Sequence, residues 1–385
     1  MTLREKIEQE IREHGPMPFS RYMEMCLYDP ELGYYSCHTE QFGKAGDFYT
    51  SSDVHAVFGR LLARQFEEMW RVQGSPQRME LLELGPGRGL FARDVLDWSE
   101  KKFPEFFQAL HYRLAEGSLA LRQRLRVTLS RALAAGKASL EEGFSAAEAA
   151  PISVAEALAQ NPCIVFANEF FDALPVEILG PQGKLHIGLQ GGRLTETWSQ
   201  APAAELEFLD RYSVHPEAGE RVEAPLAAQR FMRQLAAHLR RGFLIIIDYG
   251  STRQEQLAGR HRGTVMAYRQ HAASANPYEA PGEQDITAHV NFTALAAAAE
   301  QNGMLVQPLL TQSQFLMGVG EQNQFADAFE ECFLPPERAK VALQLKHLVT
   351  PAGMGESFHV LVASKSIDAA KVEGLSGLSF GKTRR

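Results

Sequence analysis

One stretch, MELLELGPGRGLFARDVL at residues 79–96, constrains the fold more than any other part of the chain. A short apolar run is followed by glycines at 85, 87 and 89, and then by a helical pattern that begins at Leu90. Glycines between a strand and a helix let the backbone, with its unpaired N–H groups, come close to a ligand. In open parallel sheets such turns lie outside the carboxyl ends of the strands, where ligands bind. The stretch therefore predicts a parallel sheet with a ligand site at this turn.

The rest of the chain repeats the alternation of strand and helix. Apolar runs predict strands at Tyr112–Ala115, Cys163–Asn168, Phe243–Asp248, Met304–Leu310 and Phe358–Ser364. Helical spacing predicts helices at Leu3–His14, Phe19–Leu27, His55–Val72, Pro225–Arg241 and Phe292–Gln301, and one that begins near Leu119 with Ser118 as its cap. This order is typical of an α/β fold with a mostly parallel sheet covered on both faces.

Four regions are expected along the chain. Residues 1–75 form an N-terminal helical segment and a cofactor-covering loop, and residues 76–250 form the core, with a hairpin insertion at about 176–200. Residues 251–370 supply a substrate-side insertion and complete the sheet. Residues 371–385 lack periodicity and are expected to be a flexible tail, and Gly242 is expected to end the preceding helix. The alanine-rich stretch 132–159 gives no clear assignment.

Composition excludes several classes of protein. The net charge of −8 and pI of about 5.9 argue against a nucleic-acid binder, which usually carries a basic excess. The four cysteines are widely scattered, which predicts reduced thiols in a cytoplasmic protein and neither disulfides nor a zinc site. No apolar run reaches the roughly 18 residues that span a bilayer.

The glycine turn favours one ligand over another. Leu90 stands where the dinucleotide motif GxGxxG has its third glycine, and the carboxylate of Glu83 would repel a pyrophosphate. S-adenosylmethionine has an ammonium group, a positive sulfonium and no phosphate, and so suits this turn better. Glu116, at the end of the next strand, is placed to accept hydrogen bonds from ribose hydroxyls. A nicotinamide-dependent oxidoreductase is the disfavoured alternative.

Several ordered sequence blocks extend this interpretation to a family. They are ELGPGRG, GPMPFSRYMEMCLYDPELGYYS, GDFYTSSDVHAVFGRLLA, ANEFFDALPVE, IIDYG, DITAHVNF and TQSQFLMGVG, spread over about residues 15–320. In these blocks the chain resembles the class I S-adenosylmethionine-dependent methyltransferases. Within them it is similar to the MidA-type family, which is related to a mitochondrial complex I assembly arginine methyltransferase. The resemblance implies a Rossmann-like methyltransferase core with an N-terminal helical segment and family-specific insertions.

The resemblance also implies roles for particular residues. Glu83, Gly85, Gly87 and Gly89 would form the cofactor loop and Glu116 the ribose contact, with Thr50 and Ser51 as further polar contacts from the covering loop. Asn168 and Glu169 would line the methyl-transfer cavity. The implied activity is methylation of an arginine in a protein, a subunit of respiratory complex I. A non-catalytic assembly factor that keeps the fold is the alternative, and a homodimer is one assembly that we consider.

The acceptor side depends on two acids. Glu169 and Asp172 lie three residues apart and would share a face of a helical turn, where they could orient a guanidinium and take up its proton. Asp172 could instead cap the turn before Pro175. Asp285, His289 and Asn291 form either a substrate-lining loop or a helix cap, and Asn291 stands where the family commonly has an acid. Tyr34 and Tyr35 are expected to dock the N-terminal segment, and no metal is expected.

Overall fold

The computed structural model describes residues 1–37, 56–141, 143–144, 152–260, 262–269 and 272–380. At its centre lies a nine-stranded sheet in the order β15-β17-β10-β5-β2-β3-β4, with β14 beside β10 and β16 beside β17. The strands are β2 Met79–Leu84, β3 Leu110–Ala115, β4 Ala138–Leu140, β5 Cys163–Asn168, β10 Gly242–Ser251, β14 Val290–Asn291, β15 Leu305–Val306, β16 Leu310–Thr311 and β17 Phe358–Lys365. The pairs among β4, β3, β2, β5 and β10 are parallel, and β17 runs antiparallel to β10. The predicted mostly parallel sheet is confirmed.

Helices cover both faces of this sheet. One face carries α5 Ala56–Val72, α6 Leu90–Lys102, α7 Pro104–Ala109 and α15 Gln312–Glu321, and the other carries α10 Ile152–Gln160, α12 Leu226–His238 and α14 Phe292–Glu300. Strand β10 shows why two cores form. Ile245 and Ile247 join the core under α5, whereas Leu244 and Ile246 join the core under α12, because successive side chains of a strand point to opposite faces. Each such buried side chain contributes about 1.5–3 kcal/mol.

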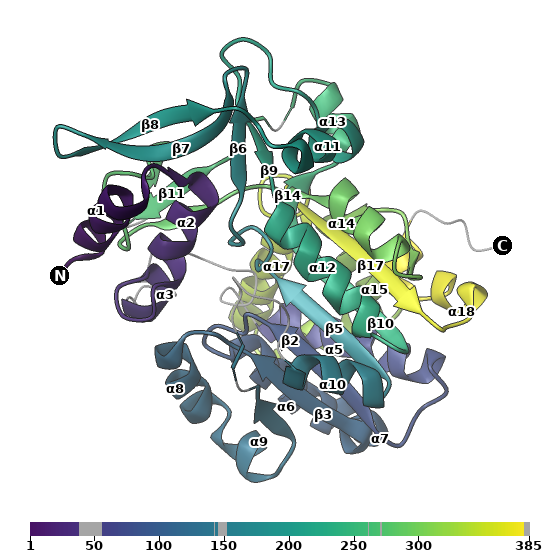
Figure 1. Cartoon of the computed structure of the whole chain (residues 1–385). Helices are drawn as coiled ribbons and strands as arrows, with labels where there is room; N and C mark the ends of the chain where they lie inside the picture. The colour runs from purple at the N-terminus through teal and green to yellow at the C-terminus, as the bar shows by residue number, and fades with distance from the viewer. Residues whose placement is uncertain (38–55, 142, 145–151, 261, 270–271, 381–385) are drawn as a thin grey trace.

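The N-terminal segment packs against a second, antiparallel sheet beyond the carboxyl ends of the central strands (Figure 1). It comprises α1 Leu3–His14, β1 Met17–Pro18, α2 Phe19–Tyr28 and α3 Tyr34–Cys37. The second sheet comprises β1 together with β6 Glu177–Gly180, β7 Gly183–Gln190, β8 Arg193–Ser199 and β9 Val222–Ala224, and a third comprises β11 Met266–Arg269, β12 Ala272–Ser274 and β13 Asp285–Thr287. Ile7 and Phe19 share one apolar cluster with Ile187 of β7 and Ile286 of β13, so the N-terminal segment packs against both the second and the third sheet.

The remaining helices lie at connections. They are α8 Leu119–Thr128, α9 Ser130–Ala134, α11 Ala203–Tyr212, α13 Arg253–Leu257, α16 Ala326–Phe329, α17 Pro335–Val349, α18 Ala369–Glu373 and a 3₁₀ turn, Ser376–Leu378. Most predicted helices appear within one to three residues of their expected ends, and Ser118 caps α8 as expected.

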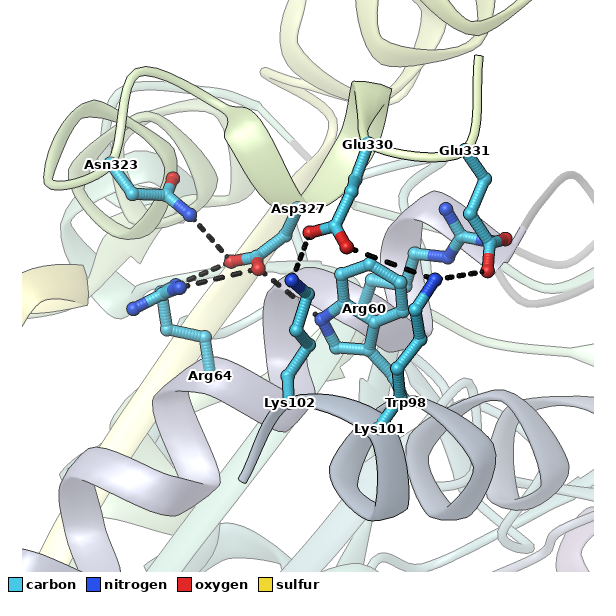
Figure 2. Close-up of polar contacts among 9 residues, drawn as sticks. All are labelled: Arg60, Arg64, Trp98, Lys101, Lys102, Asn323, Asp327, Glu330 and Glu331. Carbon is cyan, nitrogen blue, oxygen red and sulfur yellow. Dashed lines mark hydrogen bonds and ion pairs between the residues drawn. The ribbon is translucent and has the colours of Figure 1, made fainter. Parts of the chain in front are cut away.

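A polar cluster holds α16 against α5 and α6. Figure 2 shows the buried carboxylate of Asp327 receiving hydrogen bonds from the guanidinium of Arg64, the indole of Trp98 and the amide of Asn323. Around it, Glu331 pairs with Arg60 and Lys101, and the Arg60 guanidinium lies 4.4 Å above the Trp98 ring. The cluster fixes the segment between α15 and α17 on the face of the sheet that α5 and α6 cover, away from the carboxyl ends of β2 and β5.

Residues 371–380, the described part of the predicted flexible tail, are ordered against the core. Val372, Leu375 and Leu378 are buried, and Ser376 donates to the Glu68 carboxylate from its amide (3.0 Å) and its hydroxyl (2.6 Å). The segment is held by hydrogen bonds to side chains of α5 and not by a long amphipathic helix, so it carries no helical period for the sequence to display.

Two further predictions are corrected. Gly242 begins β10 and does not end α12, and a Cβ there would lie 1.8 Å from the carbonyl oxygen of Cys163, so the position requires glycine. The predicted strand Met304–Leu310 is divided into β15 and β16, which flank Pro308, a residue that has no N–H for a strand ladder. In the unassigned stretch 132–159, β4 forms the edge of the sheet.

Candidate functional site

A cavity opens at the carboxyl ends of β2, β3 and β5, where the glycine turn, the segment after β5 and the N-terminal helices meet. Five acids line it: Glu83, Glu116, Glu169, Asp172 and Asp285. Among the described lining residues, Arg88 alone carries a positive charge. The fold therefore brings together acids from positions 83 to 285 of the sequence, and a cationic ligand would favour their ionised forms.

The glycine turn leaves room on the cavity side. Gly85, Gly87 and Gly89 all have positive φ, at 64°, 52° and 74°. A Cβ on Gly87 would meet nothing within 4 Å, so a ligand can approach the backbone there. A Cβ on Gly89, the N-cap of α6, would lie 2.6 Å from the Leu125 side chain, so this glycine is needed for packing against α8.

Glu83 is the last but one residue of β2 and only 4% exposed. The hydroxyl of Tyr112, on the neighbouring strand β3, donates to its Oε2 at 2.7 Å. Burial raises the pKa of Glu83 to about 8, and the nearby Glu116 raises it further, while the Tyr112 hydrogen bond opposes the shift. A cation that binds here would stabilise the ionised carboxylate.

Glu116 follows the last residue of β3 and faces the same cavity. The amide of Ser118 donates to its Oε1 at 2.9 Å, and the amides of Gly87 and Gly117 also hydrogen-bond to the carboxylate. Burial nevertheless raises the pKa of Glu116 to about 7. The two acids therefore lie on either side of the glycine turn, as the sequence predicted.

The segment after β5 turns sharply. Glu169 has a left-handed backbone, with φ of 51°, which is unusual for a residue with a side chain. The amide group of Asn168 donates to Glu169 Oε1 at 3.0 Å. Asp172 is 4% exposed, and its Oδ2 accepts a hydrogen bond from the Tyr249 hydroxyl. Its Oδ1 is buried and receives no side-chain hydrogen bond from the described residues. Burial raises the pKa of Asp172 to about 6, and the Tyr249 hydroxyl and the backbone amides of Ala173 and Asp172 oppose this shift.

Glu169 and Asp172 would share a face if this segment were a helical turn. It is an irregular turn, but it still directs Asn168, Glu169 and Asp172 to one cavity. The residue that holds the turn is Asp248, which sequence reasoning missed. Its buried Oδ2 accepts hydrogen bonds from the amides of Phe170, Phe171 and Asp172 at 3.1–3.3 Å. Burial, followed by the charges of Asp172 and Glu169, raises the pKa of Asp248 well above its usual value. Its signal in the sequence was an acid at the end of the apolar run FLIIID.

Two tyrosines of the N-terminal segment cover the cavity. The Tyr28 hydroxyl donates to the carbonyl of Ala173 at 2.9 Å, and the Tyr35 hydroxyl donates to Asp285 Oδ1 at 2.9 Å. Tyr34 is buried among the N-terminal helices, in agreement with its predicted docking role. Tyr35, which was expected to dock as well, also lines the cavity.

Asn291 lies away from this cavity. Its Oδ1 accepts from the amide of Ala294 at 2.9 Å, and its Nδ2 donates to the carbonyl of Tyr212 at 2.9 Å. It is therefore the N-cap of α14, the simpler of the two alternatives, and is not among the residues that line the cavity. His289 packs edge-on against Tyr249.

Thr50 and Ser51 lie outside the described residues, so their predicted contacts stay predictions. Within the described part of the chain, no group of three or more His, Cys, Asp or Glu side chains is arranged to hold a metal ion. None of the described helices combines the length and apolar character needed to cross a membrane.

Comparison with known proteins gives concordant matches. Residues 61–309 match the sequence profile of a family described as S-adenosyl-L-methionine-dependent methyltransferases. A Drosophila melanogaster protein, named protein arginine methyltransferase NDUFAF7 homolog, mitochondrial, is 30% identical over 98% of this chain and 88% of its own length. The human protein arginine methyltransferase NDUFAF7, mitochondrial, is 27% identical over 91% of this chain and 80% of its own length.

A solved structure matches the whole chain. The crystal structure of a COG1565 superfamily protein from Burkholderia thailandensis, bound to S-adenosyl-homocysteine, superimposes with a TM-score of 0.81 and 28% identity. The match covers 100% of this chain and 95% of that one. The fold is therefore that of the class I methyltransferases, as the sequence predicted.

One prediction is contradicted by these relatives. The fly, mouse and human proteins are named as mitochondrial, which conflicts with the cytoplasmic location expected from the sequence. The reasoning from cysteines was the weak step. All four cysteines are free, but free thiols indicate a reducing environment and do not distinguish one reducing compartment from another.

Proposed function

Because the chain belongs to this family of S-adenosyl-L-methionine-dependent methyltransferases, we propose that it methylates an arginine side chain of a protein, with the acceptor held by Glu169 and Asp172. The enzyme class and the cofactor follow from the family. The arginine acceptor is suggested by the names of the relatives and supported by the chemistry of the cavity.

The residues around the glycine turn fit the cofactor. Glu83 offers a carboxylate to an ammonium group, Glu116 offers hydrogen-bond acceptors to ribose hydroxyls, and Gly87 leaves the backbone accessible. The cofactor supplies a methyl group on a positively charged sulfur. A cavity with five acids and one described base suits a cation far better than it suits a phosphate.

The observation that carries the acceptor assignment is Asp172 Oδ1, a buried carboxylate oxygen at the cavity wall that receives no side-chain hydrogen bond from the described residues. An unsatisfied buried polar atom costs about 1–3 kcal/mol, which a bound donor group would recover. A guanidinium has five N–H donors in one plane and pairs bidentately with carboxylates.

These residues also account for the proton. When a guanidinium nitrogen gains a methyl group, one of its N–H protons must leave. Asp172, whose pKa is raised by burial to about 6, would accept that proton, and Glu169 would orient the guanidinium. Asn168, hydrogen-bonded to Glu169, would hold that carboxylate in position.

A subunit of a respiratory complex is the acceptor that the family resemblance suggests, and it remains part of the proposal. The alternative is a non-catalytic factor that keeps the fold and binds a partner. An accessible glycine turn with both acids in place favours the enzyme, because a binding factor has no need of a cofactor cavity.

The test is methyl transfer to protein. The purified chain would be incubated with isotopically labelled S-adenosylmethionine and a protein extract from cells that lack its gene, and modified residues located by mass spectrometry. We expect methylarginine with the wild type, a loss of at least about 100-fold in Glu169→Gln and Asp172→Asn, and unchanged S-adenosyl-homocysteine affinity. The exposed Glu105→Gln on α7 is the control.

Full activity in Glu169→Gln would remove that residue from the mechanism. Labelled small molecules, or labelled lysine without labelled arginine, would contradict the acceptor. Cofactor binding without any transfer from the wild type would favour the non-catalytic alternative.

A further inference from the structure

The acceptor end of the cavity has a third carboxylate on a different element. Asp172 follows β5, whereas Asp285 is the first residue of β13, more than a hundred residues later. Both line the cavity and both are buried. The Tyr28 hydroxyl donates to the carbonyl of Ala173, next to Asp172, and the Tyr35 hydroxyl donates to Asp285, so the two carboxylates face the part of the cavity that these tyrosines line.

Asp285 is held in place by the N-terminal segment. The Tyr35 hydroxyl donates to its Oδ1 at 2.9 Å, and the carbonyl of Tyr35 accepts from the Ser118 hydroxyl at 2.6 Å. Ser118 in turn donates its amide to Glu116. Three hydrogen bonds, joined through the covalent frames of Ser118 and Tyr35, thus connect Glu116 on the cofactor side of the cavity with Asp285.

Aromatic rings lie beside these carboxylates. The centroids of Tyr28 and Tyr35 are 5.6 Å apart, and both residues line the cavity. A guanidinium is flat and delocalised, and it can stack on an aromatic ring while its N–H groups point in several directions within its plane. An ammonium is a compact charge with three donors on a single nitrogen and no planar face, so it cannot stack flat on a ring while donating to the carboxylates.

We propose that Asp285, held by Tyr35, is a third acceptor-binding carboxylate, which with Asp172 makes the pocket selective for a guanidinium over an ammonium. This rests on the proposed arginine acceptor and assigns to the N-terminal segment a part in substrate choice. Asp285 would contact the acceptor directly, and Tyr35 is a positioning residue that acts through Asp285.

The test measures binding of two small probes to the full chain saturated with S-adenosyl-homocysteine. N-acetyl-arginine amide and N-acetyl-lysine amide would be titrated by NMR against the wild type, Asp285→Asn and Tyr35→Phe. We expect the wild type to prefer the arginine probe. Loss of one charge-assisted hydrogen bond predicts about tenfold or greater weakening in Asp285→Asn, and Tyr35→Phe, which keeps the ring, should weaken it by about threefold or more. Binding of the lysine probe should change less in both variants.

Tyr22→Phe is the matched control. The Tyr22 hydroxyl donates to the carbonyl of Pro277 at 2.7 Å, so the variant loses a buried hydrogen bond on the same N-terminal segment but away from the cavity lining. It should lose stability without a change in arginine binding. S-adenosyl-homocysteine affinity, measured in each variant, shows whether the cavity is still folded.

The outcomes separate the two proposals. A wild type that binds the arginine probe, with Asp285→Asn and Tyr35→Phe unchanged, overturns the role of Asp285 and leaves the proposed function standing. Equal weakening of the arginine and lysine probes overturns the selectivity. A wild type that does not bind the arginine probe contradicts the arginine acceptor itself, and the role of Asp285 falls with it.

Discussion

At the scale of single residues, the cavity holds two acids whose protonation should depend on the ligand. Burial raises the pKa of Glu83 to about 8 and that of Glu116 to about 7, so in the unliganded protein both bind protons near neutral pH. A ligand with an ammonium group favours the ionised forms. Binding therefore releases protons in the range between the ordinary carboxyl pKa and about 8.

The first prediction is a pH-dependent affinity. Between pH 6 and 8 the affinity for S-adenosyl-homocysteine should rise, by up to about tenfold per pH unit for each carboxyl that must lose its proton. Calorimetry in buffers of different ionisation enthalpy would detect the released protons. Glu83→Gln should bind more weakly and release fewer of them. An affinity that is constant over this range would show that neither acid contacts the cofactor.

The second prediction concerns stability. A carboxyl whose pKa is raised in the folded state binds more protons folded than unfolded, so the free energy of unfolding falls as pH rises through this window. For Glu83 the window runs from about pH 4.5 to about 8, with a slope of up to about 1.4 kcal/mol per pH unit. Denaturant unfolding of the unliganded protein at pH 6 and 8 measures this fall, and Glu83→Gln should make it smaller. A fall of equal size in the variant would rule out Glu83 as its source.

At the scale of elements, the cluster in Figure 2 tests what anchors α16 to the face of the sheet that α5 and α6 cover. Asp327 is buried with several donors around its carboxylate, whereas the Glu331 side chain is 44% exposed. Asp327→Ala would leave Arg64 and Trp98 without their acceptor.

We expect Asp327→Ala to lower the free energy of unfolding by about 2–4 kcal/mol, because removing one member of a buried ion pair leaves the other charge without a partner. Glu331→Ala should lower it by less than about 1 kcal/mol, because an exposed ion pair contributes little. Urea unfolding of both variants measures the difference. Similar losses of stability in the two variants would mean that the Asp327 carboxylate contributes no more than an exposed ion pair. S-adenosyl-homocysteine binding should be unchanged in both, since the cluster lies away from the cavity.

The elements also show which sequence signals were informative. The long helices and the apolar strands were predicted from the spacing of their buried side chains, and the glycine turn with Glu83 indicated the ligand site. The turn after β5 could not be predicted, because its shape depends on Asp248, almost eighty residues away, accepting from three successive amides. Likewise β4 is three residues long and is defined by pairing with β3 and not by a pattern of its own.

At the scale of the whole molecule, the C-terminal segment closes one core. Val372, Leu375 and Leu378 pack with the helices α5 and α15, and Ser376 bonds to Glu68. These three apolar residues stand three positions apart, which is a helical spacing. The pattern is too short to have predicted a helix from the sequence.

Truncation after Asp368 should therefore destabilise the protein by several kcal/mol, since each buried side chain of this size contributes about 1.5–3 kcal/mol. Thermal unfolding compares the truncated chain with the full chain. Ser376→Ala in the full chain should cost less, about 1 kcal/mol, because it removes the hydroxyl and keeps the packing. An unchanged melting temperature after truncation would mean that the segment does not contribute to the core.

The arrangement of the site is likewise a property of the whole chain. The sequence predicted Glu83 and Glu116 from their places at the ends of strands, and Glu169 and Asp172 from the family resemblance and their spacing. All four line the cavity. For Asp285 the sequence left a substrate-lining loop and a helix cap as alternatives, and for Tyr35 it favoured docking over a place beside the ligand. Their place at the cavity depends on how the N-terminal segment and β13 pack together.

The most direct test of the account is a crystal structure of the chain with S-adenosyl-homocysteine and N-acetyl-arginine amide. We predict the cofactor product between Glu83 and Glu116, against Gly87, and the guanidinium within hydrogen-bonding distance of Asp172 Oδ1. S-adenosyl-homocysteine bound elsewhere, or an arginine group away from Asp172 while the cofactor site is filled, would contradict it.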